Sequence, residues 1–189
     1  MNMGFNDLWP TKLYLNKIDE DINKQLCDAI FLEIGFNNSI MVSDYFDILN
    51  EGTSKVFQIF RDTVVIPSFI NYLDHIDIDS KQFPDFKIKS WLTGVYEGYS
   101  IPIHNHSGAT LSAVFYTLCD NTLKGGELVL LDSRLNANRG YKPQFKKLFE
   151  NMIYSPKSGE YIIFPSHVYH QTIPFFGKIR MAIVVDLFL

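Results

Sequence analysis

The second half of the chain is divided into short segments rich in β-branched and aromatic residues, and no helical pattern separates them after Pro84. Gly, Pro, Asn or Ser lies between the segments, as is typical of strands joined by turns. Seven strands are predicted, at residues 86–97, 110–118, 126–131, 151–155, 160–165, 168–174 and 178–188. Because consecutive strands without crossover helices pair antiparallel, the pattern predicts a sandwich or barrel and excludes a βαβ fold.

The first half has a different periodicity. Residues 12–17 alternate in polarity and predict one short strand. Apolar residues then recur at helical spacing between Asp19, which can cap a helix, and Gly35, which can end it. A second helix is predicted at about residues 53–73, and Pro67 should kink it or split it.

These patterns predict one domain over residues 1–189, with mostly helical support in 1–83 and a β-rich core in 84–189. Apolar residues make up 47% of the chain and charged residues 20%, which is a globular composition. A net charge of −4 argues against nonspecific binding to nucleic acid. The apolar runs are far shorter than the ~20 residues of a membrane span, and the first residues do not form a signal peptide.

The chain has two cysteines, Cys27 and Cys119, in different contexts. Two distant cysteines exclude a disulfide scaffold and a cysteine-based zinc module. They fit a reducing compartment, so we expect a cytoplasmic protein without a membrane or nucleic-acid partner. The oligomeric state is left open by the sequence.

Four of the five histidines fall in two clusters within the β-rich half. His104 and His106 are two residues apart, so on a strand both imidazoles project to one side. His167 and His170 differ in parity, so only one of them should face inward. Neutral imidazole is the commonest metal ligand in proteins, and the clusters therefore indicate a metal site. The alternative for His167 is an ordinary polar residue at a strand entry, and His75 is expected to be an ordinary polar residue of the surface.

Arg180 lies inside an apolar predicted strand, residues 179–185. A buried guanidinium is costly unless an anion pairs with it, and it binds carboxylates through two parallel hydrogen bonds. Arg180 is therefore a candidate for binding a ligand carboxylate. The alternative is an arginine that faces solvent on an edge strand.

Several short motifs occur in a characteristic order along the β-rich half. They are His104-Asn105-His106, Gly125-Gly126-Glu127-Leu128, the Gly-x-x-Ile-Ile-Phe-Pro run at 159–165, His170 and Arg180. This order resembles the Fe(II)/2-oxoglutarate-dependent oxygenase superfamily, in particular its prolyl-hydroxylase-like branch of small bacterial and phage proteins. The segment at 8–14 resembles the start of the same group, and the resemblance is strongest over residues 91–186. It implies a double-stranded β-helix, or jelly roll, around a single iron.

The resemblance also implies roles for individual residues. His104 and His170 match the two histidine ligands of Fe(II). Arg180 matches the residue that pairs with the C5 carboxylate of 2-oxoglutarate, the co-substrate. Tyr116 matches a position that hydrogen-bonds the same carboxylate, although it can equally be a core residue. No catalytic residue beyond the metal ligands is implied.

The implied activity is hydroxylation of an amino acid, a peptide side chain or a small metabolite, with release of succinate and CO₂. Substrate choice is expected to depend on a long predicted loop at 133–150 and on three aromatic residues expected at the mouth of the site. These residues are Trp91, Tyr96 and Tyr99.

His106 departs from the family pattern, which has Asp or Glu as the third ligand. We predict that His106 completes a set of three histidines. Asp132 or Glu127 is the alternative third ligand, and His106 would then lie outside the ligand set. Two other functions fit the same residues: a cupin-type three-histidine metalloenzyme that does not use 2-oxoglutarate, and a jelly-roll binding module without catalysis.

Overall fold

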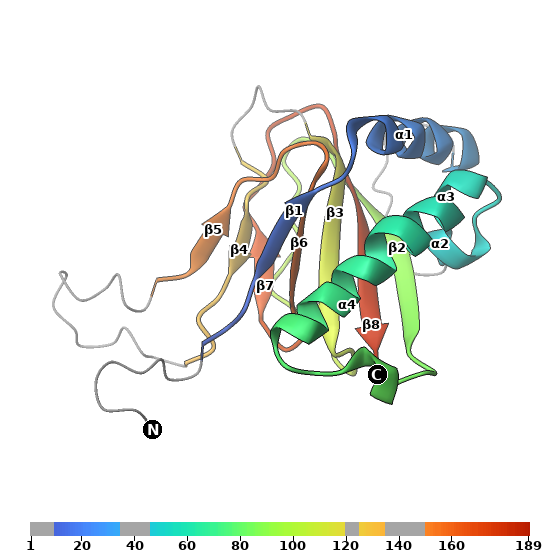
Figure 1. Ribbon diagram of the computed structural model, residues 1–189. Helices are drawn as coiled ribbons and strands as arrows, with labels where there is room; N and C mark the ends of the chain where they lie inside the picture. The colour runs from blue at the N-terminus through green and yellow to red at the C-terminus, as the bar shows by residue number, and fades with distance from the viewer. Residues whose placement is uncertain (1–9, 35–45, 120–124, 135–149) are drawn as a thin grey trace, which may run out of the picture.

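The computed structural model describes residues 10–34, 46–119, 125–134 and 150–189. Eight strands lie in this part of the chain. They are β1 (Tyr14–Lys17), β2 (Lys87–Val95), β3 (Leu111–Cys119), β4 (Leu128–Leu130), β5 (Met152–Tyr154), β6 (Glu160–Pro165), β7 (His170–Thr172) and β8 (Arg180–Phe188). One antiparallel sheet has the order β1-β6-β3-β8-β2, and a smaller one has the order β5-β4-β7 (Figure 1). All seven strands predicted after Pro84 occur, as does the one predicted near the N-terminus.

The helices precede the main run of strands in the chain. They are α1 (Glu20–Ile34), α2 (Ile48–Glu51), α3 (Lys55–Phe60), the π-helical turn η1 (Arg61–Val65), α4 (Ile66–His75) and the 3₁₀ turn η2 (Ser80–Gln82). The predicted cap of the first helix is confirmed, because the Asp19 carboxylate accepts hydrogen bonds from the backbone N–H groups of Asp21 and Ile22. The short helix α2 was not predicted.

Pro67 splits the second predicted helix, as the sequence indicates. It lies in the first turn of α4, directly after the π-helical turn η1. Proline has no backbone N–H and cannot complete the α-helical hydrogen-bond ladder. The wider turn of η1 lets the chain pass this position and continue as α4, with the Ile66 N–H bonded to the carbonyl of Arg61.

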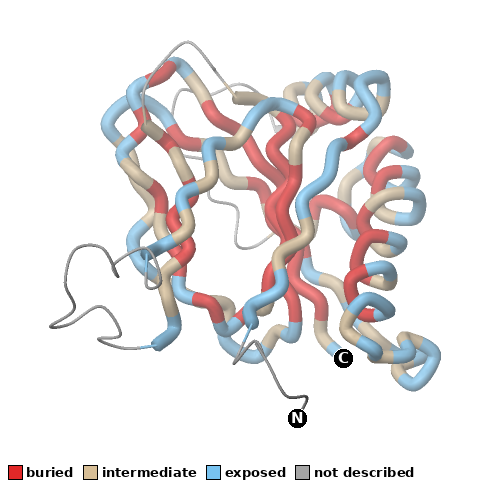
Figure 2. Tube along the Cα trace, turned by 60° about the vertical axis from the view of Figure 1, so that its left-hand side comes forward, coloured by how far each residue is buried: buried red, intermediate tan, exposed pale blue. Residues whose placement is uncertain are grey.

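Alternating residues of the large sheet face two different cores. On β3, Ala113 and Phe115 face the helices, where the Phe115 ring meets that of Phe60 edge-on at 5.1 Å between centroids. Val114 and Tyr116 face the other way, into a second cluster shared with the smaller sheet. Figure 1 shows the helices on the outer side of the large sheet, and Figure 2 shows buried chain in the sheets and along the inner faces of the helices.

The architecture is therefore mainly β with N-terminal helices, as predicted. The two sheets face each other, and the helices stiffen the back of the larger sheet. This arrangement leaves the inner face of the large sheet free to line a cavity, which the next section describes.

Candidate metal centre

The backbone brings His104 and His170 together. An isolated antiparallel bridge joins them, with the His104 N–H bonded to the His170 carbonyl at 2.9 Å and the reverse bond at 2.8 Å. His170 begins β7, where it pairs with Leu130 of β4. The His106 N–H donates to the Ser166 carbonyl at 3.1 Å. The connection between β2 and β3 is therefore fixed against the segment before β7.

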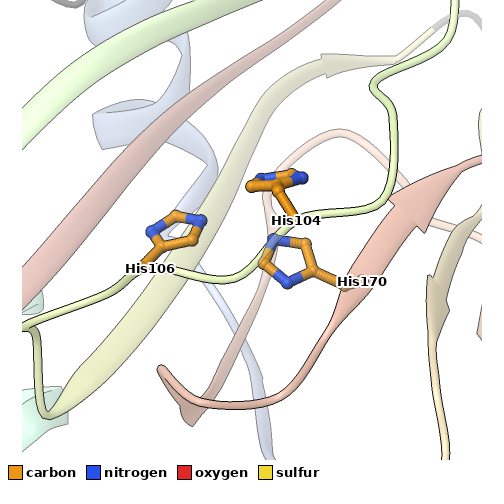
Figure 3. A group of neighbouring side chains, drawn as sticks. All are labelled: His104, His106 and His170. Carbon is orange, nitrogen blue, oxygen red and sulfur yellow. The ribbon is translucent and has the colours of Figure 1, made fainter.

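The three imidazoles converge. One nitrogen from each of His104, His106 and His170 lies within 4.8 Å of the others. The ring centroid of His170 lies 4.2 Å from that of His104 and 5.1 Å from that of His106. Figure 3 shows the three side chains pointing toward one another from two segments of the chain. In the described part of the chain, no Asp or Glu belongs to this group.

Hydrogen bonds determine which nitrogen of each ring is free. Nδ1 of His104 lies 2.8 Å from the Pro102 carbonyl, and Nδ1 of His170 lies 2.9 Å from the Val168 carbonyl. A carbonyl oxygen only accepts, so both Nδ1 atoms carry hydrogen. Nδ1 of His106 lies 2.7 Å from a carboxylate oxygen of Asp186 and donates to it in the same way. The three Nε2 atoms therefore have free lone pairs.

Burial favours the neutral forms of His104 and His170. Desolvation lowers the pKa of His170 to about 3, against a smaller opposing effect of its bond to Val168. Desolvation also lowers the pKa of His104. Neutral imidazole is the form that binds a metal, so the arrangement suits a divalent cation.

A cavity of ≈ 370 Å³ adjoins the three histidines. The inward residues of β8 form one wall, because side chains alternate along a strand. These residues are Arg180, Ala182, Val184 and Asp186. Val114 and Tyr116 of β3 continue the wall. The cavity is thus mostly apolar, with imidazoles in one part and a guanidinium in another.

Arg180 is buried, with 6% of its surface exposed, which excludes the solvent-facing alternative. Its Nη1 atom has no hydrogen-bond partner among the described residues. The guanidinium carbon lies 5.8 Å from the centre of the Tyr116 ring. A buried cation with a free donor beside an apolar cavity fits an anionic ligand group, and a carboxylate matches the planar fork.

Gly126 makes room for this guanidinium. Its φ is +80°, and a Cβ atom there would lie 3.1 Å from Nη1 of Arg180 and 2.9 Å from a ring carbon of Phe175. Glycine is thus required both by the backbone conformation and by the space that Arg180 occupies.

The other predicted residues lie in different places. Trp91 and Tyr99 line the cavity, whereas Tyr96 is not among the lining residues and is 40% exposed. His75 and His167 are exposed, while His170 is buried, so one histidine of the second cluster faces inward. Most of the predicted loop 133–150 lies outside the described residues.

The two alternative carboxylate ligands are not placed at the histidines. Asp132 pairs with Arg134, with Oδ1 2.9 Å from Nε, and lines a separate pocket. Glu127 does not line the histidine cavity. One oxygen of Glu127 is buried without a hydrogen-bond partner among the described residues.

Asp186 and Ser112 were not singled out from the sequence. Asp186 accepts from His106 and, at 2.7 Å, from the hydroxyl of Ser112. The signal was present: Asp186 is a lone carboxylate in an apolar strand and has the same parity as Arg180. The cost of a buried charge, which singled out Arg180, applies to Asp186 as well.

Three converging imidazoles and a buried arginine in one cavity are the features expected of an enzyme with a single metal ion and an anionic co-substrate. The family model described as "Putative 2OG-Fe(II) oxygenase" matches residues 89–186, just over half of the chain. The chain belongs to this family. The predicted superfamily, the oxygenase class and the cofactors Fe(II) and 2-oxoglutarate are thereby confirmed, and the match favours the oxygenase over the cupin-type enzyme and the binding module.

Solved structures confirm the fold. A prolyl-4-hydroxylase from Pseudomonas putida is 13% identical, with a TM-score of 0.62 over 92% of this chain and 85% of that one. HygX from Streptomyces hygroscopicus, with nickel and 2-oxoglutarate bound, is 9% identical, with a TM-score of 0.64 over 94% and 81%. A viral collagen prolyl hydroxylase from Paramecium Bursaria Chlorella virus-1 is 11% identical, with a TM-score of 0.59 over 93% and 94%.

No curated protein sequence matches the chain significantly. Within the described residues, none of the helices has the length and apolar character needed to cross a membrane.

Proposed function

We propose that the chain binds Fe(II) through Nε2 of His104, His106 and His170 and 2-oxoglutarate through Arg180, and that it hydroxylates a small molecule or a peptide side chain. The observation that carries the proposal is the free Nη1 of buried Arg180, in the same cavity as three free imidazole nitrogens. A buried guanidinium donor without a partner is costly, so an anionic ligand in this cavity would stabilise Arg180.

The protein residues supply binding, orientation and exclusion of water. Arg180 would hold the C5 carboxylate of 2-oxoglutarate, which fixes the co-substrate at the end away from the metal. Buried Tyr116, whose pKa burial raises, stays protonated beside it and can donate a hydrogen bond to the same carboxylate. Leu128, Val114 and Val184 line the cavity and keep the site apolar.

When bound, Fe(II) and 2-oxoglutarate supply the oxidative chemistry, in which O₂ is consumed, the keto acid becomes succinate and CO₂, and the substrate gains an oxygen atom. Trp91, Tyr99 and Asn105 line the same cavity and would contact the substrate. HygX has been crystallised with hygromycin B, and other neighbours are prolyl hydroxylases, so small molecules and peptides both deserve testing.

The test combines metal binding with co-substrate turnover. We expect the wild type to take up one Fe(II) per chain anaerobically and to form succinate from 2-oxoglutarate in air. His104→Ala and His170→Ala should each abolish stoichiometric metal uptake. His167→Ala is the matched control, because this exposed histidine lies three residues from His170 and outside the cluster. Metal uptake that survives in both ligand variants would contradict the assignment.

Arg180→Met tests the co-substrate separately. Methionine keeps a long apolar side chain and removes the guanidinium, so the variant should fold and bind metal. Removing one partner of a buried charge pair typically costs about 2–5 kcal/mol of binding, so the dissociation constant of 2-oxoglutarate should rise at least about tenfold. Arg180→Lys should be intermediate because it keeps the charge without the fork. Calorimetry of the nickel-loaded proteins measures both, and unchanged affinity in Arg180→Met would favour a metalloenzyme that does not use 2-oxoglutarate.

A further inference from the structure

The ligand set proposed above lacks the carboxylate that usually accompanies two histidines at non-haem iron. Three neutral imidazoles leave both positive charges of Fe(II) unbalanced, whereas a two-histidine, one-carboxylate set balances one of them. A negative charge near the cluster, outside the ligand set, would offset part of this excess.

Asp186 is that charge. It lies near the C-terminal end of β8, is 7% exposed and lines the same cavity as the histidines. Its Oδ1 atom is 2.7 Å from Nδ1 of His106. It is not part of the converging group itself, so it lies behind His106 and not among the candidate ligand atoms.

Within the described ranges, no lysine or arginine forms an ion pair with Asp186. Among the described residues, its ion-pair partner is His106. Lys89 is its register neighbour on β2, but Lys89 is exposed and no ion pair joins the two. A buried carboxylate without a cation is destabilising. A divalent cation on the far side of the His106 ring would supply a positive charge.

Asp186 is also held in one orientation. The hydroxyl of Ser112, which is opposite Asp186 in the β3–β8 register, donates to Oδ1 at 2.7 Å. That hydroxyl is 2.9 Å from the hydroxyl of Ser166, and the Ser166 carbonyl accepts from the His106 N–H. Ser112 and Ser166 are fully buried. These hydrogen bonds hold His106 in place at both its backbone and its ring.

We propose that Asp186 is the positioning carboxylate of the metal centre: it binds Nδ1–H of His106, directs Nε2 at the metal and provides through the imidazole the negative charge that the ligand set lacks. This inference rests on the proposed function, because it requires metal at the three histidines. The carboxylate is then not a metal ligand itself but lies behind the third ligand, His106. Carboxylates behind metal-bound histidines raise the basicity of the ring and fix its orientation.

The first experiment compares metal affinities. Ni(II), a redox-stable probe, and anaerobic Fe(II) are titrated calorimetrically into the wild type, D186N and D47N. Removing such an outer carboxylate typically costs 10–100-fold in metal affinity, which is the result expected for D186N. D47N is the matched control, because Asp47 also accepts from a serine, Ser90, but does not line the cavity. D47N should bind metal within about threefold of the wild type.

A double-mutant cycle separates positioning from support of the fold. Because Asp186 acts through the His106 ring, D186N should change metal affinity less than threefold when it is added to H106A. An equal loss in both backgrounds would mean that Asp186 supports the structure and would overturn the inference. Urea unfolding of the metal-free variants checks the fold. If D186N does not fold, Asp186→Ser replaces it with the same expectation.

Moving the negative charge into the ligand set should raise the metal affinity that D186N lowers. The variant H106D/D186N keeps one negative charge and moves it into the ligand set, so it should bind Fe(II) at least tenfold more tightly than D186N. Failure of this rescue would overturn the inference.

Different results would overturn the proposed function and the role of Asp186. A wild type that binds no metal, or H104A that binds like the wild type, overturns the proposed function and this inference with it. A wild-type site that H104A abolishes but D186N leaves unchanged overturns the inference alone.

Discussion

At the scale of single residues, the site depends on polar groups that are buried before any ligand is present. Arg180 has a donor without a partner among the described residues, and the buried carboxylate of Asp186 has an imidazole, that of His106, as its ion-pair partner. Each costs stability in the empty protein, as is common at sites built to bind ions. The same two residues mark opposite ends of the inward face of β8, so one strand carries a group for the co-substrate and a group for the metal.

Gly126→Ala tests whether the guanidinium of Arg180 needs the space that Gly126 leaves. Gly126→Ala places a methyl group 3.1 Å from Nη1 of Arg180 and strains a backbone with φ of +80°. The strain alone should lower the free energy of unfolding by about 1–2 kcal/mol. The displaced guanidinium should also weaken 2-oxoglutarate binding, while metal affinity stays within about twofold. Calorimetry with each ligand checks this, and unchanged 2-oxoglutarate affinity would show that the guanidinium adapts freely. Gly108→Ala is the control for backbone strain, since its φ is +88° and a Cβ there meets nothing within 4 Å.

At the scale of elements, alternate residues of β3 have different roles: one set packs against the helices, and the other set faces the cavity. Phe115 is completely buried against the helices and stacks on Tyr161 with 4.7 Å between ring centroids. Val114, the preceding residue, faces the cavity. Two adjacent substitutions should therefore have different consequences.

Phe115→Ala should lower the free energy of unfolding by about 3–5 kcal/mol, as expected for a large cavity in a core. Val114→Ala removes two methyl groups and should cost only about 1.6 kcal/mol. Its main effect should be on 2-oxoglutarate and substrate binding, because it enlarges the cavity. Urea unfolding and ligand titration of both variants measure the difference. Equal stability losses with equal ligand affinities would contradict this division of β3.

The elements themselves were largely predictable from the sequence. Turn residues and β-branched segments located the strands within a few residues, and Pro67 marked the break between α3 and α4. The short helix α2 was missed because four residues contain no helical period. Of the site, spacing indicated His104 and His106 and one of His167 and His170, the family resemblance selected His170, and the cost of a buried charge selected Arg180. The role of Asp186 could not be predicted, because the pairing of Nδ1 of His106 with a residue 80 positions away depends on the register of β3 with β8.

At the scale of the whole molecule, both thiols belong to the packed structure. Burial raises the pKa of Cys119 to about 12, and burial is also the largest cause of the raised pKa of Cys27. The reactive form of a thiol is the thiolate. At pH 8 in the native protein, only a small fraction of either thiol is therefore in the reactive form. Reaction with a disulfide reagent should be slow for the native protein and fast in denaturant. Fast reaction of both thiols without denaturant would mean that the fold opens readily around β3.

Ligand binding should stabilise the whole domain, because the unfolded chain has no assembled site. Metal or co-substrate at 100 times its dissociation constant adds about 2.7 kcal/mol. For a chain of this size, that corresponds to a rise in Tm of about 5–10 °C. We expect Ni(II) to raise Tm, 2-oxoglutarate to raise it further only when Ni(II) is present, and EDTA to reverse both shifts. His104→Ala should lose both shifts, whereas Arg180→Met should keep the first and lose the second. This pattern follows from a metal that completes the co-substrate site, since the keto acid bound by Arg180 would have its other end at the three histidines. A Tm shift by 2-oxoglutarate in His104→Ala equal to that in the wild type would instead mean that the co-substrate binds independently of the metal.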